Sequence, residues 1–438
     1  MIKRSFFGLA KPRFEYKTLP DKLPEPEEIS CSENVTLLLS TFPEQKDGTL
    51  SVKEGDKIKS GQKLFFINNE DTYVISSVTG TISSISSLTG DFGAFYTAVS
   101  INVSDNEEID EQFEKYAKTS SPDTANTAKD FLACVPGNLP LNSLINPEKP
   151  INTIVISGCE NDLLVYTNQY IVKTAIDSIK SGIDILKDIT GADDIIIVLP
   201  RGFKHEFGDI DARVSTIDTG YPAASPYLIM RNILSRIVPA GQSPEDLGVC
   251  FITAEAVASV GRAFTSGKIP VKKTITVIDK DESVKLAVAE IGTPVRDILS
   301  QLGITLNEKD RIVLGGPMTG TAVYSDEHPI MPDTGAIMIQ DSENIPHVSD
   351  YPCINCGDCI RICPAKIPIN MLVRLLEAGQ YEEAADYYDL YSCIECGLCG
   401  LVCVSKIPIF QYIKLAKYEL GRMSIVEEPD DYSGGDDE

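Results

Sequence analysis

The chain has 438 residues, of which 43% are hydrophobic, enough for two to four globular domains with separate cores. The formal net charge of −25 argues against nucleic-acid binding, because such proteins gain affinity by neutralising phosphates with Lys and Arg. No apolar run approaches the roughly 18–20 residues that cross a bilayer, and the first residues are not followed by the apolar stretch of a signal peptide. We therefore expect an intracellular protein without a transmembrane helix.

Residues 30–105 are rich in Val, Ile, Ser, Thr and Gly, a composition that predicts short strands joined by turns. The segments 52–62 and 75–82 resemble the two halves of a biotinyl/lipoyl-like barrel-sandwich. Neither segment places a Lys at a recognisable hairpin tip, so we interpret this region as a structural β module. The polar and charged stretch 106–130 is typical of a solvated linker.

From residue 151 onward, predicted strands alternate with predicted helices. Segments 151–156 and 194–199 are apolar enough for buried strands, and they flank a helix predicted from Tyr166 to Lys187. A further strand at 249–252 leads into a helix at 254–264. This alternation predicts an α/β domain with a mostly parallel sheet.

A smaller α+β segment extends from Val271 to about Ile339. It is predicted to contain strand 273–278, helix 295–302 and strand 311–314, followed by a turn at 315–320. The glycine pair that opens this turn is compatible both with the approach of a ligand and with a tight structural turn.

Eight of the 12 cysteines lie between residues 353 and 403, a local concentration that indicates metal ligation rather than a disulfide scaffold. They form two copies of C-x2-C-x2-C-x3-C at an offset of 40 residues, which is the bacterial ferredoxin spacing for [4Fe–4S] clusters. In that arrangement the fourth cysteine of each copy completes the other cluster. One predicted ligand set is therefore Cys353, Cys356, Cys359 and Cys403, and the other is Cys393, Cys396, Cys399 and Cys363.

Two zinc sites are the alternative, since zinc also binds four thiolates, but zinc ribbons usually pair two distant C-x2-C motifs. The sequence departs from the ferredoxin pattern at Val404, where Pro is usual. Apolar spacing predicts helices at 369–386, with a break at Gly379, and at 410–420. We expect a small helical domain over residues 346–425.

The remaining candidate residues have ordinary structural interpretations. His205, His328 and His347 are scattered without the spacing of metal ligands or of a general base. Cys134 and Cys159 are interpreted as small buried hydrophobic residues rather than redox centres. No hydrolase or phosphotransfer motif is present in the sequence.

Taken in order, these segments resemble the RnfC family, the C subunits of Rnf-type ion-translocating electron-transport complexes, over nearly the whole chain. The most specific stretches are 291–297, 314–320 and 393–417. The resemblance implies a multidomain α/β and α+β protein on the cytoplasmic side of the cell membrane, attached peripherally to a complex that couples ferredoxin oxidation to ion transport. It implies an N-terminal segment (1–29), a barrel-sandwich domain (30–105), a polar linker (106–130), a Rossmann-like, flavin-domain-like α/β domain (131–268), an SLBB-like β-grasp domain (269–345), a helical 2×[4Fe–4S] ferredoxin domain (346–425) and an acidic disordered tail (426–438).

The flavin and nucleotide motifs of that family are altered in this chain. Where relatives carry a glycine-rich G-x-G-G-A-G-F-P-T loop, residues 131–143 contain one glycine and two prolines, so the backbone amides of a phosphate cradle are lost. The family's E-C-E-P segment appears as 158–162, where only Cys159 and Glu160 are retained. The K-Y-P-Q-G-G-E motif appears as 220–226. We therefore expect the usual FMN and NADH sites to be missing, and no cofactor-binding or catalytic residue is assigned beyond the eight cysteines.

The leading hypothesis is an iron–sulfur subunit that relays electrons from ferredoxin through two [4Fe–4S] clusters. Its partners would be the other Rnf subunits, including integral membrane ones, and a multihaem cytochrome c would accept electrons in place of NAD. Three alternatives are an NADH/FMN-dependent ferredoxin:NAD oxidoreductase subunit with an atypical nucleotide site, a soluble cobalamin or amino-acid reductase partner, and a mainly structural subunit. NADH–dye reductase activity would identify the first alternative, and co-purification with integral membrane subunits would exclude the second. If the third is right, Ser replacements of Cys356 and Cys396 should leave ferredoxin oxidation by the complex intact.

Overall fold

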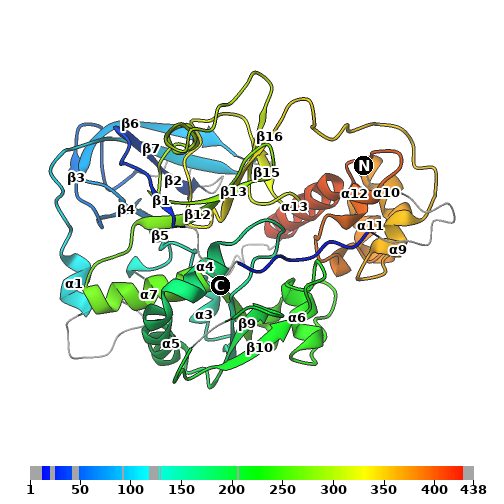
Figure 1. Ribbon diagram of the computed structural model, residues 1–438, viewed down its shortest axis with the longest axis horizontal. Coiled ribbons are helices and arrows are strands. Elements are labelled where there is room, and N and C mark those ends of the chain that lie inside the picture. The colour runs from blue at the N-terminus through cyan, green and yellow to red at the C-terminus, as the bar shows by residue number, and fades with distance from the viewer. Residues whose placement is uncertain are drawn as a thin grey trace, which may run out of the picture. The chain divides into compact units, whose positions relative to one another are not determined.

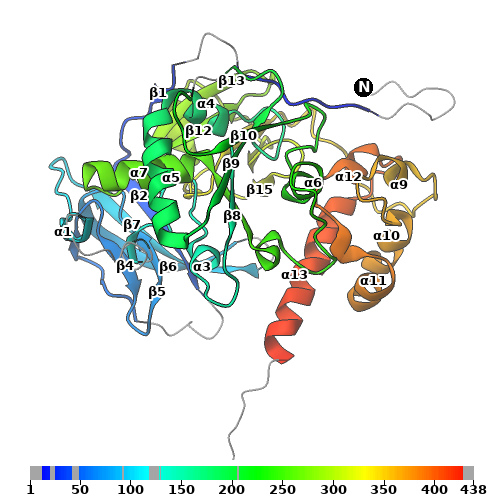
Figure 2. The same cartoon turned by 90° about the horizontal axis from the view of Figure 1, so that it is seen from below.

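The computed structural model describes residues 12–19, 25–41, 49–90, 93–117, 128, 130–204 and 207–427. The chain divides into two compact units. The larger unit holds residues 13–238 and 243–345, and the cysteine-rich unit holds the chain from residue 346, with 1–12 and 239–242. Figure 1 and Figure 2 show the mixed α/β elements of the larger unit and the helices of the other. The expected organisation, a multidomain chain with mixed α/β elements, is confirmed. The predicted tail falls almost wholly outside the described residues.

The N-terminal part of the larger unit is a β module with two small sheets. A four-stranded antiparallel sheet has the order β2-β7-β6-β3, and β4 and β5 form a two-stranded sheet. Leu37, Leu64 and Ile101 meet in one apolar core to which both sheets contribute. The prediction of strands joined by turns is confirmed here, but β2, β6 and β7 are longer than expected, with 8, 10 and 9 residues. The strands are β2 (Asn34–Thr41), β3 (Lys57–Ile58), β4 (Lys63–Phe66), β5 (Asn69–Ile75), β6 (Gly80–Thr89) and β7 (Phe95–Val103).

A parallel sheet of order β10-β9-β8-β11 forms the centre of the α/β part, and all three of its strand pairs run parallel, as predicted. Its strands are β8 (Thr153–Ser157), β9 (Asp194–Pro200), β10 (Arg213–Ile217) and β11 (Val249–Thr253). The associated helices are α3 (Leu141–Leu144), α4 (Thr167–Thr174), α5 (Ile176–Thr190), α6 (Pro226–Asn232) and α7 (Ala254–Ser266).

The single helix predicted from Tyr166 to Lys187 is wrong, because the structure has two helices there. Ala175 leaves the helical region with φ −123° and ψ 35°, which separates α4 from α5. Both helices contact α7. At the start of α4, the hydroxyl of Thr167 also lies 2.9 Å from that of Thr276 in a neighbouring strand.

Helices α5 and α7 lie side by side in Figure 1 and Figure 2, and two glycines allow their backbones to touch. A Cβ at Gly261 would lie 1.9 Å from the carbonyl oxygen of Ser178, and one at Gly182 would lie 2.1 Å from that of Val257. Any larger residue at these positions would force the helices apart.

The last part of the larger unit is a six-stranded mixed sheet of order β1-β13-β12-β16-β14-β15. Helix α8 (Val295–Gln301) packs on it through Val295, Ile298 and Leu299. The strands predicted at 273–278 and 311–314 and the helix at 295–302 are confirmed to within a residue. The strands are β1 (Glu27–Glu28), β12 (Lys272–Ile278), β13 (Val284–Glu290), β14 (Arg311–Leu314), β15 (Thr321–Val323) and β16 (Ala336–Gln340).

Part of the stretch expected to be a solvated linker is folded. Residues Gln112–Ala117 form helix α1, which buries Phe113. The ring of Phe113 makes edge contacts with Phe131 and Phe264, at centroid distances of 5.9 and 5.6 Å. Tyr116 also contacts the Phe131 ring, so two aromatic residues of this charged segment pack the helix on the α/β core.

In its described residues, the cysteine-rich unit consists of four short α-helices and the 19-residue α13 around one apolar core, which contains cysteines together with Leu372, Ile413 and Ala416. The helix break predicted at Gly379 is confirmed, and this residue has φ 71°. The helices are α9 (Asp358–Ile362), α10 (Ile369–Glu377), α11 (Tyr381–Tyr387), α12 (Leu398–Val402) and α13 (Ile409–Glu427).

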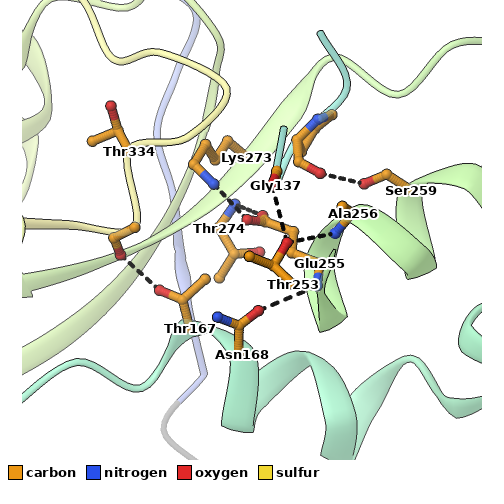
Figure 3. Close-up of polar contacts among 12 residues, drawn as sticks. Gly137, Thr167, Asn168, Thr253, Glu255, Ala256, Ser259, Lys273, Thr274 and Thr334 are labelled. Atoms are coloured by element: carbon orange, nitrogen blue, oxygen red, sulfur yellow. Dashed lines mark hydrogen bonds and ion pairs between the residues drawn. The ribbon is translucent and has the colours of Figure 1, made fainter. Parts of the chain in front are cut away.

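A buried ion pair connects α7 to β12 in the larger unit (Figure 3). The ammonium of Lys273 bonds to the carboxylate of Glu255, and the side chains are only 1% and 3% exposed. The Glu255 carboxylate also accepts a hydrogen bond of 2.9 Å from the backbone N–H of Thr274. Neither charged group has access to water, so each buried charge is stabilised mainly by the other.

Replacing Lys273 with Met should therefore lower the free energy of unfolding by about 3–5 kcal/mol, because it leaves the Glu255 carboxylate buried without a counter-ion. The double variant Lys273→Met/Glu255→Gln should recover part of that loss. Thermal and chemical denaturation measure both variants, and a single variant as stable as the unmodified chain would contradict this role.

Candidate metal centre

The two cysteine copies adopt the same backbone conformation, residue for residue at an offset of 40. Each copy has a left-handed residue before its second cysteine, a left-handed glycine after it, and a left-handed lysine after its fourth cysteine. A helix begins after each glycine, and the fourth cysteines, Cys363 and Cys403, leave these helices with φ near −60° and ψ near 120°. The matching pairs are Asn355 and Glu395, Gly357 and Gly397, and Lys366 and Lys406.

The first set of predicted ligands surrounds one cavity. Three cysteines of the first copy and the fourth cysteine of the second line this cavity, together with apolar side chains that include Val373 and Ile407. Sequence spacing alone paired Cys403 with the distant first copy, and the fold brings it there. The four cysteines are Cys353, Cys356, Cys359 and Cys403.

The second set also comes together. Burial is the main cause that raises the pKa of the Cys396 thiol to about 11, and the neighbouring thiols of Cys393 and Cys363 raise it further. Burial is also the main cause that raises the pKa of the Cys399 thiol, and the thiols of Cys393, Cys396 and Cys363 raise it further. Cys363, from the first copy, therefore lies among the first three cysteines of the second copy.

The donors at both places suit a thiolate-bound iron–sulfur cluster. Each place gathers four sulfur atoms, within a unit whose core is apolar, and the backbone N–H of Glu395 points at the Cys393 sulfur over 3.4 Å. Burial raises the pKa of the Cys359 thiol to about 11, so thiolates at these places need a positive partner. Among the described residues, no group of three or more His, Cys, Asp or Glu side chains is arranged around a single metal ion.

Polar contacts that the sequence did not predict hold the two ligand loops. In the second copy, Lys417 on α13 donates to the Cys393 carbonyl over 2.8 Å and pairs with Glu395 over 2.7 Å. In the first copy, the amide of Asn370 donates to that of Asn355 over 2.7 Å. An alignment of the two copies at the offset of 40 places Lys417 opposite Glu377. This reversal of charge could have drawn attention to Lys417 in the sequence.

The rim of the first cavity is apolar and exposed. Tyr351 is 68% exposed, Ile354 64% and Val404 36%. The backbone N–H of Ser349 donates to the carbonyl of Lys406 over 3.0 Å, so the segment around Tyr351 lies beside the segment around Val404. Val404, the departure from the usual proline, is part of this surface.

The segment 131–143, where the family resemblance predicts a change in the glycine-rich loop, packs against the start of α7 (Figure 3). The hydroxyl of Thr253 donates to the carbonyl of Gly137 over 3.0 Å, and that of Ser259 donates to the carbonyl of Pro136 over 3.0 Å. A Cβ at Gly137 would lie 2.3 Å from the backbone nitrogen of Ala256. The loop thus presents carbonyl oxygens to this helix, whereas a phosphate would need N–H donors.

The 158–162 segment contains two buried carboxylates. The Asp162 carboxylate accepts from the backbone N–H groups of Met318 and Thr319, over 3.0 and 2.7 Å. A Cβ at Gly316 would lie 2.5 Å from the Asp162 carboxyl carbon, so this glycine makes room for the carboxylate. These contacts agree with the interpretation of 315–320 as a structural turn.

Glu160 is the second buried carboxylate. One of its oxygens accepts from the backbone N–H of Asn168, and the other has no hydrogen-bond partner. Burial raises the pKa of Glu160 to about 8.

The other singled-out residues have no role in this centre. His328 contacts the carbonyl of Pro329 and His347 is exposed, whereas His205 lies outside the described residues. Burial raises the pKa of Cys134 to about 12 and that of Cys159 still further, which disfavours reactive thiolates at both positions.

The pKa of Glu160 predicts a pH-dependent stability. Between about pH 4.5 and about pH 8 the unfolded chain has lost a proton that the folded chain still holds, so stability falls as pH rises through this window. Glu160→Gln, which cannot ionise, should raise the thermal unfolding midpoint at pH 8 more than at pH 5. Equal effects at the two pH values would contradict the assignment.

Comparison with known proteins supports the metal centre. Residues 352–407 match the 4Fe-4S dicluster domain family. The chain is 24% identical to the C subunit of an ion-translocating oxidoreductase complex from Methanosarcina acetivorans, over 77% of this chain and 82% of that protein. A protein of the same name from Pseudomonas aeruginosa is 27% identical, over 50% of this chain and 30% of its own length. The C subunit of the Na(+)-translocating ferredoxin:NAD(+) oxidoreductase complex of Acetobacterium woodii is 23% identical, over 73% and 76%.

This chain is a relative of the C subunits of Rnf-type complexes. The resemblance seen in its sequence is confirmed. Among solved structures, a chain of an NAD+-reducing [NiFe]-hydrogenase is similar with a TM-score of 0.47 and 12% identity, over 74% of this chain and 70% of that one. None of the helices in the described part of the chain combines the length and apolarity needed to cross a membrane.

Proposed function

We propose that this chain is an iron–sulfur electron-transfer subunit of a membrane-bound, ion-translocating oxidoreductase complex. The observation that carries the proposal is the convergence of two four-cysteine sets, each completed by a cysteine from the other copy. The names of the relatives and the match to a dicluster family support it. The chain would attach peripherally on the cytoplasmic side.

The cysteines would hold two [4Fe–4S] clusters, which carry one electron each when bound. The chain's own part is to supply eight thiolates, to direct backbone N–H groups at sulfur, as Glu395 does at Cys393, and to exclude water with an apolar core. Since Cys363 and Cys403 each reach the opposite set, the fold would also keep the two clusters close together.

Electron exchange would take place at the first set, because Cys356 is exposed and the rim of Tyr351, Ile354 and Val404 offers an apolar docking surface. The partner there would be ferredoxin or a neighbouring subunit. We further propose that electrons leave toward a cytochrome c rather than toward NAD.

The crossed ligand sets have a direct test. Cys403→Ser should alter the same electron paramagnetic resonance signal as Cys356→Ser, although the two residues belong to different sequence copies. Cys363→Ser should alter the other signal, together with Cys396→Ser. If Cys403→Ser instead behaves like Cys396→Ser, each copy holds its own cluster and the crossed arrangement is wrong.

The second candidate function is an NADH-linked subunit with a flavin site. The name of the Acetobacterium woodii relative, a subunit of a ferredoxin:NAD(+) oxidoreductase complex, favours the NAD-linked part of this function. Against it stand the contacts of Gly137 and Pro136, whose carbonyls face α7 where a phosphate cradle would need N–H donors.

The anaerobically purified chain should therefore contain no stoichiometric flavin, and NADH should leave the cluster absorbance unchanged. Dithionite serves as the positive control for reduction. One flavin per chain, or bleaching by NADH, would establish the second candidate instead.

A further inference from the structure

The repeated cysteine unit is symmetric in its ligands but not in the charges around them. At the offset of 40, Lys417 corresponds to Glu377, and Glu395 corresponds to Asn355. The first loop is held by a neutral amide pair between Asn355 and Asn370, whereas the second is held by the Lys417–Glu395 ion pair. The second set of cysteines therefore has a cation at a position where the first has none.

Lys417 is close to the ligands and largely shielded from water. Its ammonium bonds to the carbonyl of Cys393, itself a predicted ligand, over 2.8 Å. The Lys417 side chain is 20% exposed and that of Glu395 is 41% exposed, so solvent screens the carboxylate more than the ammonium. The net effect of the pair at the cysteines is therefore positive.

The first set also has a cation nearby, but in a weaker position. Arg361 donates to the carbonyl of Cys356 over 3.0 Å, and it pairs with Asp358. Here the order of exposure is reversed, since the Arg361 side chain is 48% exposed and that of Asp358 is 27% exposed. Water screens the Arg361 guanidinium more than the Asp358 carboxylate. Arg361 should therefore stabilise added negative charge at the first set less than Lys417 does at the second.

We propose that Lys417 is a positioning residue that makes the cluster of Cys393, Cys396, Cys399 and Cys363 easier to reduce than the cluster of the other set. Taking up one electron adds one negative charge to a cluster and its four thiolates, and a nearby shielded cation stabilises that charge. The inference rests on the proposed ligation of two clusters. At equilibrium a single electron would reside on the second cluster, so transfer would run from the exposed first set to the second.

The experiment is a redox titration of the purified, cluster-loaded chain, with the two cluster signals followed by electron paramagnetic resonance. Lys417→Met should shift the midpoint of one signal to lower potential and leave the other in place. Glu395→Gln should shift the same signal in the opposite direction, because it removes a negative charge and keeps the ammonium. Opposite shifts at one cluster are not expected of residues that only hold the loop.

Two further variants serve as controls. Lys417→Arg keeps the charge and should leave both midpoints close to those of the unmodified chain. Arg361→Met removes the matched cation of the first set and should shift the other signal by less than Lys417→Met shifts its own.

Unchanged midpoints in both Lys417→Met and Glu395→Gln, with both signals present, would overturn the role of Lys417 and leave the ligand assignment standing. If Lys417→Met prevents cluster loading, a failure of Glu395→Gln to raise a midpoint would overturn it equally. Absence of both signals from the unmodified chain would instead contradict the proposed function itself.

Discussion

The structure of the cysteine-rich unit depends on one constraint, namely that each sequence copy supplies the last sulfur of the other copy's set. Cys403 lines the cavity of the first three cysteines, and Cys363 lies among the cysteines of the second copy. In this arrangement neither copy completes its own four-sulfur set, so the helices that follow the two copies must pack against one another. Their shared core, with Leu372 and Ile413 fully buried, is the consequence.

Local signals in the sequence predicted most of the elements and the ligand sets. Alternating apolar segments gave the parallel sheet, and the cysteine spacing gave the pairing of Cys403 with the first copy. What the sequence could not give are contacts between distant residues. Phe113 and Tyr116 pack a helix of the charged stretch on Phe131, and Lys417 reaches Cys393 only because α13 folds back on the ligand loop. No glycine or proline lies at the break at Ala175, so no local signal in the sequence predicted it.

The altered nucleotide segments have structural uses in this chain. The loop around Gly137 closes on the start of α7, and Asp162 holds the turn at 315–320. Glu160 remains a buried acid with one unpartnered oxygen, a costly group in a purely structural setting.

The proposed function depends on whether the eight sulfurs bind iron. The most direct measurement is the iron, zinc and acid-labile sulfide content of anaerobically prepared protein. Two [4Fe–4S] clusters predict about eight iron and eight sulfide atoms per chain, with little zinc. About two zinc atoms per chain without sulfide, or iron and sulfide far below these values after reconstitution, would contradict it.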